Sequence, residues 1–117
     1  KVKKRIAWFR NIYCTGLVYP CWWEPSTGVY ETIGRDDMRR LHFDPLNTVT
    51  VSIARICRLE LFSTEIVRTG GGLFTVVDYV NDPIDLRPQS AARDGVPDEI
   101  LRDIAARLAE IAGERKK

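Results

Sequence analysis

Histidine, cysteine and clustered aspartates are the residue types in this chain that could perform catalysis. His42 is the single histidine among 117 residues, and it lies near Asp36, Asp37 and Asp44. These groups could hold a metal ion for hydrolysis, or His42 could activate Cys57 as a nucleophile. Neither arrangement has the local signature or the second acidic motif that such sites need. The pattern therefore favours a solvent-facing connector, and a small hydrolase is only the third functional hypothesis.

The other chemistry-bearing patterns are incomplete. Cys14, Cys21 and Cys57 have separations that match no Cys-x-x-Cys ligand pair, which predicts idle or buried thiols, with a disulfide or a reactive thiol as the alternative. The glycine triplet at 70–72 lacks the Gly-Lys-Ser/Thr ending of a phosphate-binding loop, so it predicts a hairpin tip. We therefore expect no catalytic residue, no metal and no cofactor.

Aromatic side chains gather at the start of the chain. The first thirty residues hold all three tryptophans and seven of the eleven aromatics. Trp22 and Trp23 are adjacent, so a strand would turn their side chains to opposite faces. The rings either pack only in the core or anchor a partner, as aromatic and arginine side chains do at protein interfaces. The main hypothesis is a non-enzymatic protein-binding module, an inhibitor or adaptor of a larger macromolecular machine. Its candidate binding residues are Trp8, Trp22, Trp23, Arg35, Arg39 and Arg40.

Basic residues suggest a second function. Residues 1–58 carry ten basic and five acidic side chains, whereas residues 59–117 carry eight basic and eleven acidic ones. A basic region beside aromatic rings is typical of nucleic-acid binding, in which cations meet phosphates and a ring stacks on a base. The acidic second half weakens this alternative. Its candidate residues are Lys3, Lys4, Arg5 and Arg10.

Two short stretches resemble small aromatic-cage barrels. Residues 19–25 (YPCWWEP) are similar to the Pro-Trp-Trp-Pro signature of PWWP domains, with Cys21 and Glu24 inserted. Residues 74–81 (FTVVDYVN) resemble the strand and turn of Tudor domains, with Val80 where that pattern favours glycine. This resemblance implies recognition of methylated lysine or arginine by an aromatic cage. It covers only these two stretches, and we assign the chain to neither family.

Turn residues divide the first part of the chain into strands. Residues 6–13 are rich in β-favouring types and predict a first strand. Residues 17–24 and 29–33 flank a Pro-Ser-Thr-Gly stretch at 25–28, which predicts a β-hairpin because proline fixes φ and glycine permits a positive φ. Pro20 lacks a backbone donor, so its strand is expected at a sheet edge or broken there.

An alternating pattern predicts the longest strand. The charged residues 34–43 read as a connector that Asp44 and Pro45 bring to an end. From residue 48 to 61, apolar side chains recur mostly at every second position, as in a half-buried strand. The segment exceeds the usual strand length, so a bend or bulge is expected at 54–56.

The end of the chain predicts a hairpin and a helix. Residues 65–69 and 73–80 flank the glycine triplet, which would close the hairpin. Residues 81–95 form an irregular crossing segment. From 96 to 113, apolar residues recur every three or four positions, a proline suits the first turn, and Gly113 predicts the C-terminal cap.

These elements predict an α+β fold: a curved antiparallel β-sheet or small β-barrel of about five strands, packed by one C-terminal amphipathic helix. We expect one domain over 1–117, with a basic end at 1–5 and a β-rich body over 6–80. No apolar run is long enough to cross a bilayer, and the basic start lacks the apolar stretch of a signal peptide, so we expect a cytoplasmic protein. A homodimer through an edge strand or a tryptophan is a further hypothesis.

Overall fold

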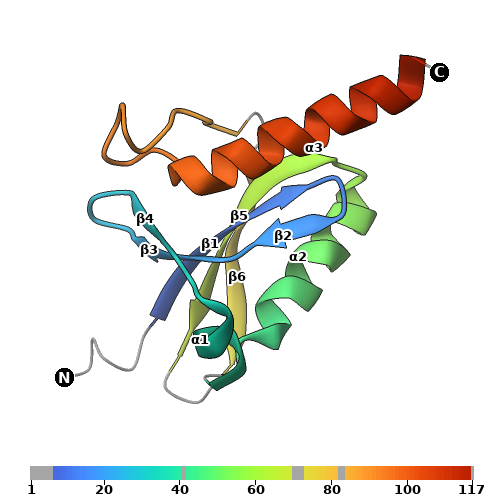
Figure 1. Ribbon diagram of the computed structural model, residues 1–117. Helices are drawn as coiled ribbons and strands as arrows, with labels where there is room; N and C mark the ends of the chain where they lie inside the picture. The colour runs from blue at the N-terminus through green and yellow to red at the C-terminus, as the bar shows by residue number, and fades with distance from the viewer. Residues whose placement is uncertain (1–6, 41, 70–72, 82–83, 117) are drawn as a thin grey trace.

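The structure, a computed structural model, describes residues 7–40, 42–69, 73–81 and 84–116 (Figure 1). This part of the chain forms six strands and three helices. In chain order they are β1 (Ala7–Cys14), β2 (Leu17–Tyr19), β3 (Cys21–Glu24), β4 (Val29–Thr32), α1 (Arg35–Arg40), α2 (Asp44–Cys57), β5 (Leu61–Arg68), β6 (Phe74–Asn81) and α3 (Asp98–Lys116). Among these residues, no helix is both long and apolar enough to span a membrane.

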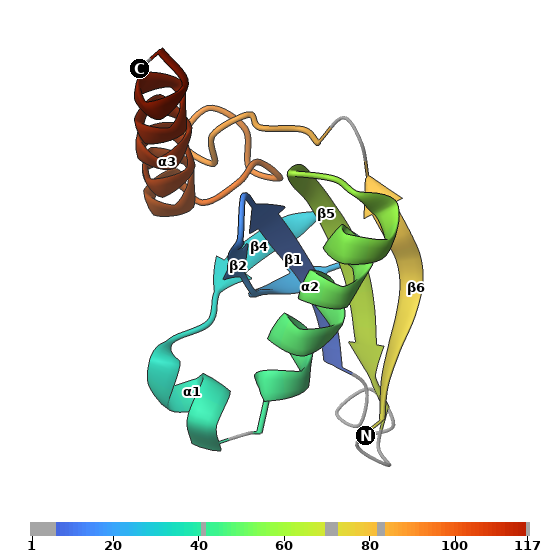
Figure 2. The same ribbon diagram turned by 90° about the vertical axis from the view of Figure 1, so that its right-hand side faces the viewer.

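The strands form one antiparallel sheet that stays open. Its order is β4-β3-β1-β5-β6, and β2 pairs with the C-terminal end of β1. Within the described strands, β4 and β6 each pair with one neighbour, so the sheet has two free edges (Figure 2). The predicted α+β class with an antiparallel sheet is therefore confirmed, whereas the small barrel given as its alternative is wrong.

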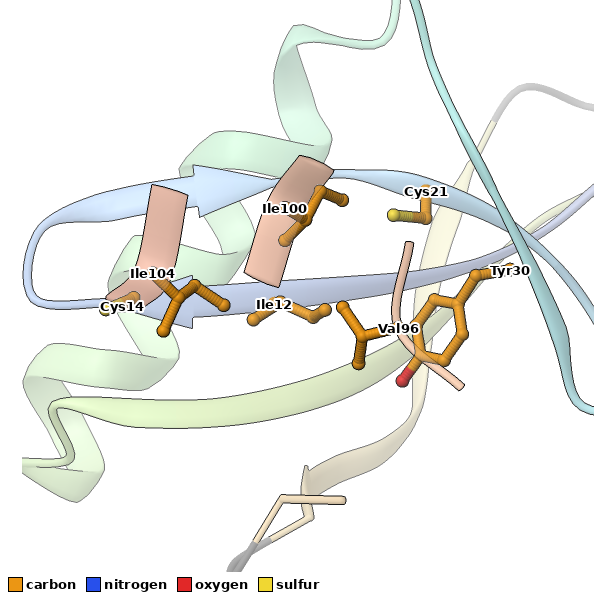
Figure 3. Close-up of a cluster of buried hydrophobic side chains, with 7 residues drawn as sticks. All are labelled: Ile12, Cys14, Cys21, Tyr30, Val96, Ile100 and Ile104. Carbon is orange, nitrogen blue, oxygen red and sulfur yellow. The ribbon is translucent and has the colours of Figure 1, made fainter. Parts of the chain in front are cut away.

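Helices pack on both faces of the sheet. Because successive strand residues point to opposite faces, β1 contributes Phe9 to the core under α2 and Ile12 to the core under α3. Figure 3 shows Ile100 and Ile104 of α3 above Ile12. The sequence predicted one packing helix, but α2 provides a second one on the opposite face.

The first predicted hairpin is confirmed. Strands β3 and β4 pair in antiparallel register, and Gly28 in their turn has a φ of +75°. Pro20 separates β2 from β3, so the strand predicted over 17–24 is broken where proline removes a backbone donor. This break lies beside β1, because β2 and β3 both pair with that strand.

The strand predicted over 48–61 is wrong, because most of that segment belongs to helix α2. Asp44 and Pro45, expected to end a connector, instead lie in the first turn of this helix. Its buried residues are Leu46, Thr50, Ile53 and Ala54, a spacing that follows one helical face. The helix ends at Cys57, and the next residue has a left-handed backbone conformation.

The second hairpin is confirmed, and the C-terminal helix is longer than predicted. Strands β5 and β6 pair, while the glycine triplet at their turn lies outside the described residues. Helix α3 continues through Gly113 to Lys116, so the predicted glycine cap is wrong. The segment before α3 is held by backbone bonds, including Val96 N–H to the Arg87 carbonyl at 2.8 Å. A Cβ at Gly95 would clash with that same carbonyl, so this crossing needs glycine.

Candidate functional site

The two adjacent tryptophans pack on opposite faces of the sheet, as predicted. Trp22 stacks on Phe9 with ring centroids 5.2 Å apart and meets the edge of Phe43. Trp23 packs against the core under α3. Both tryptophans and Trp8 are half-buried, and the exposed large apolar side chains among the described residues are aliphatic. Since Trp22 and Trp23 share no face, they do not build the aromatic cage that the PWWP resemblance implied.

The three candidate arginines lie on the short helix α1 and are exposed. Arg40 donates to Asp37 at 2.8 Å, so part of its charge is compensated within the helix. Arg35, at the first position of α1, lines a cleft described below, whereas Arg39 does not. Of the three arginines, Arg35 therefore lines the cleft and Arg40 is paired within its own helix.

The residues of the hydrolase hypothesis do not come together. His42 precedes α2 and Cys57 is its last residue, so the helix of 14 residues, about 20 Å long, separates them. Both side chains are exposed. Within the described residues, no group of three histidine, cysteine, aspartate or glutamate side chains could hold a metal ion. His42 and Cys57 therefore do not form a nucleophilic pair in this structure.

A cleft of about 410 Å³ lies where three distant segments meet. The break at Pro20 forms one side, the connection from β4 to α1 forms the second, and the first two turns of α3 form the third. We call it the α1–α3 cleft. Its lining residues are Val18, Tyr19, Pro20, Thr32, Ile33, Arg35, Glu99, Ile100 and Asp103.

Helix geometry explains which α3 side chains reach the α1–α3 cleft. Ile100 is 6% exposed because it packs on the sheet. Glu99 and Asp103 are exposed and lie four residues apart, on one side of that apolar stripe. The helix thus presents two carboxylates, one turn apart, along a single wall of the cleft. Arg35 is the one cation among the lining residues.

The carboxylates of this wall affect the pKa of the half-buried Tyr19 and of the buried Cys21. Burial, followed by the charge of Asp103, raises the pKa of the Tyr19 hydroxyl. Burial, followed by the charge of Glu99, raises the pKa of the Cys21 thiol to about 12. In the described part of the chain, neither carboxylate has an ion-pair partner. No ion pair among the described residues therefore neutralises the negative charge on the α3 wall.

A second polar cluster on the same face of the sheet is internally paired. Arg10 donates to Glu65 at 3.0 Å, with 21% and 16% of the two side chains exposed. The Arg10 guanidinium also lies 4.7 Å from the centre of the Trp23 ring. Burial raises the pKa of Tyr30, and Arg10 opposes that shift by its charge and a hydrogen bond. Arg10, predicted to contact nucleic acid, is thus held between strands, and the other basic candidates lie outside the described residues.

Another cleft, of about 480 Å³, lies at the beginning of α3. Asp98 accepts a hydrogen bond from the Ser90 backbone N–H at 3.0 Å, and the bonds to Ser90 hold the pKa of that carboxyl below its usual value. The Asp98 carboxylate that lines this cleft therefore already accepts a hydrogen bond from the crossing segment. This leaves the α1–α3 cleft as the better candidate site.

Comparison with known proteins finds no relative: no family model, curated protein or solved structure matches the chain. The residues of the cleft itself are therefore the only basis for a functional proposal. Sequence reasoning identified Arg35 but missed Tyr19, Glu99 and Asp103. The four-residue spacing of the two acidic residues beside an apolar stripe was the available signal. Their meeting with Tyr19 depends on how α3 crosses the sheet, which no local pattern encodes.

Proposed function

We propose that the protein is a non-enzymatic protein-binding module that holds a polypeptide segment of its partner in the α1–α3 cleft. The observation that carries this proposal is the composition of the cleft: apolar side chains lie between walls that carry opposite charges. Protein interfaces combine an apolar centre with a polar rim, and this arrangement orients a partner as well as binding it. Arg35 retains the orienting role predicted for it.

The α1–α3 cleft is large enough to hold a partner side chain. Its volume of about 410 Å³ falls in the range of about 300–1,000 Å³ that binding pockets occupy. Pro20 and Ile33, both half-buried, offer apolar surface to a partner side chain, while Thr32 adds a hydroxyl at the edge. The proposed activity of this surface is binding rather than turnover. Cytoplasmic location and self-association remain predictions from the sequence.

Nucleic acid is the less favourable partner. Glu99 and Asp103 would repel phosphate groups at the α1–α3 cleft, and the charge of Arg10 is already balanced by Glu65. The basic residues Lys3 and Lys4 lie outside the described residues, so this alternative gains no support from the site.

Affinity purification from native cell extract, with and without nuclease, tests the proposal. Thr32→Arg places a long side chain at the exposed edge of the cleft, whereas Thr75→Arg makes the same exchange at an exposed position on β6. We expect one stoichiometric protein partner that survives nuclease, is retained by Thr75→Arg and is lost with Thr32→Arg, while both variants keep the wild-type circular dichroism spectrum. Equal retention by the two variants, or recovery only through nucleic acid, would contradict the proposed function.

A further inference from the structure

We infer that the partner segment presents a basic side chain, lysine or arginine, to the Glu99 and Asp103 wall of the α1–α3 cleft. This inference rests on the proposed function and specifies the chemistry of the occupant. It follows from the charges that the fold leaves uncompensated, together with the apolar surface beside them.

The two carboxylates are placed where they repel each other. Like charges four residues apart on a helix destabilise it slightly, and a cation between them removes that cost. Within the described part of the chain, neither Glu99 nor Asp103 forms an ion pair. A partner's ammonium or guanidinium group would therefore bind where negative charge is concentrated.

Within the described residues, neither Arg102, three residues after Glu99, nor Arg107 forms an ion pair with the two carboxylates. Arg107 of α3 points its guanidinium to the Thr15 carbonyl at 3.1 Å and pairs with Glu110 at 3.0 Å. Arg35 belongs to the other side of the α1–α3 cleft and forms no ion pair with a described residue. One guanidinium against two carboxylates leaves the lining with a net negative charge. An occupant that is positive toward α3 complements this distribution.

The apolar surface fits the stem of such a side chain. Lysine and arginine bury their methylene groups on apolar surface while the charged end stays hydrated. Pro20 and Ile33 line the α1–α3 cleft together with the two carboxylates, so the apolar stem and the charged end of one side chain can both find contacts there. After burial, the charge of Asp103 helps to raise the pKa of Tyr19, against the opposing charge of Arg107, and the charge of Glu99 helps to raise that of Cys21.

Selection from a displayed library of random short peptides tests this inference with the whole protein. The selection is run in parallel on the wild type and on the cleft-blocked Thr32→Arg variant, and only peptides lost on the blocked variant are kept. We expect those peptides to share a lysine or arginine. A fluorescein-labelled peptide from this set should bind about tenfold more weakly when its basic residue is replaced by norleucine.

Charge variants of the protein complete the test. The double variant Glu99→Gln, Asp103→Asn should abolish the preference for the basic residue over norleucine. The matched variant Asp36→Asn, Glu60→Gln removes two exposed charges outside the α1–α3 cleft and should leave that preference unchanged. Cleft-dependent peptides that lack a basic residue, or that bind the Glu99 and Asp103 variant equally well, would overturn the inference alone. If no cleft-dependent peptide is enriched, the proposed function fails and the inference fails with it.

Discussion

The two faces of the sheet use similar residues for different purposes. Under α2, Phe9 lies against Trp22 and Phe43, with ring centroids 5.2 and 5.0 Å away. Under α3, Trp23 instead faces the guanidinium of Arg10, which is paired with Glu65. The aromatic concentration at the start of the chain is therefore divided between a cluster of packed rings under α2 and the surroundings of a charged pair under α3. The α1–α3 cleft, whose lining includes Glu99 and Asp103, lies on the α3 face.

Strand β1 produces this difference because it lies inside the sheet and alternates in character. Phe9 and Asn11 point to α2, where both are fully buried. Arg10 and Ile12 point to the other face. Even the polar Asn11 is buried on the α2 side, because its side-chain amide nitrogen donates a hydrogen bond of 2.9 Å to the Thr50 hydroxyl. The α2 face is thus closed by tight packing, while the α3 face keeps groups that can meet a ligand.

Removing a ring from the α2 face should give the largest loss of stability. Phe9 is fully buried and contacts Trp22, Phe43 and Phe74. Phe9→Ala should lower the free energy of unfolding by about 3–5 kcal/mol, because it removes buried apolar surface and leaves a cavity. Urea denaturation followed by circular dichroism measures this change. Val77→Ala, at a position 49% exposed, should cost under about 0.5 kcal/mol. A loss below 1 kcal/mol for Phe9→Ala would show that this face is not tightly packed.

Local turn chemistry made much of the fold predictable. The two hairpins follow from Gly28 and the glycine triplet at 70–72, and α3 follows from its apolar stripe. Helix α2 was missed because two periods coincide there: Val49 and Ile53, four residues apart, satisfy both strand alternation and a helical face. Their β-branched side chains further favoured a strand. A tertiary contact favours the helix. The side-chain amide of Asn11 donates a hydrogen bond to Thr50, which lies 39 residues away on the buried face of α2.

The candidate site was less predictable because its parts are distant. The sequence predicted Arg35 as a binding residue within the charged connector at 34–43. Glu99 and Asp103 needed only the recognition that two acids one turn apart flank Ile100. The contact of these elements with the break at Pro20 required the strand order. Likewise, the partner of Arg10 lies 55 residues away at Glu65, so no spacing rule could identify it.

Breaking the ion pair on the α3 face should have a smaller effect than losing Phe9. Glu65→Gln leaves the guanidinium of Arg10 four-fifths buried without its carboxylate, and should cost about 1–3 kcal/mol. A double-mutant cycle with Arg10→Met should give a coupling energy of about 1 kcal/mol or more, measured by urea denaturation.

A surface pair of similar length provides the control for that cycle. Arg40 and Asp37 are 2.8 Å apart, but 71% and 39% of their side chains are exposed. Their coupling energy should stay below about 0.5 kcal/mol, because water and salt screen exposed charges. Equal coupling in the two cycles would mean that burial does not strengthen the Arg10–Glu65 pair.

The α3 face should also make stability depend on alkaline pH, through a buried thiol. Burial raises the pKa of Cys21 from 9.0 to about 12. As pH rises, the unfolded chain loses this proton first, so the folded protein binds more protons and the free energy of unfolding decreases. This contribution is intact below pH 9 and is lost progressively between pH 9 and 12. It amounts to about 1–2 kcal/mol between about pH 8 and 10.

Comparing Cys21→Ala with Cys57→Ala isolates this effect from other alkaline titrations. Burial raises the pKa of Tyr30 as well, so the wild type should lose stability by more than the thiol alone explains. Cys21→Ala should reduce the decrease between about pH 8 and 10 by about 1–2 kcal/mol, whereas the exposed-site variant Cys57→Ala, which leaves Cys21 in place, should preserve it. Identical pH profiles for the two variants would show that the Cys21 thiol ionises as easily in the folded state as in the unfolded one. The core under α3 would then be more hydrated than its packing indicates, and the contrast between the two faces would rest on charge alone.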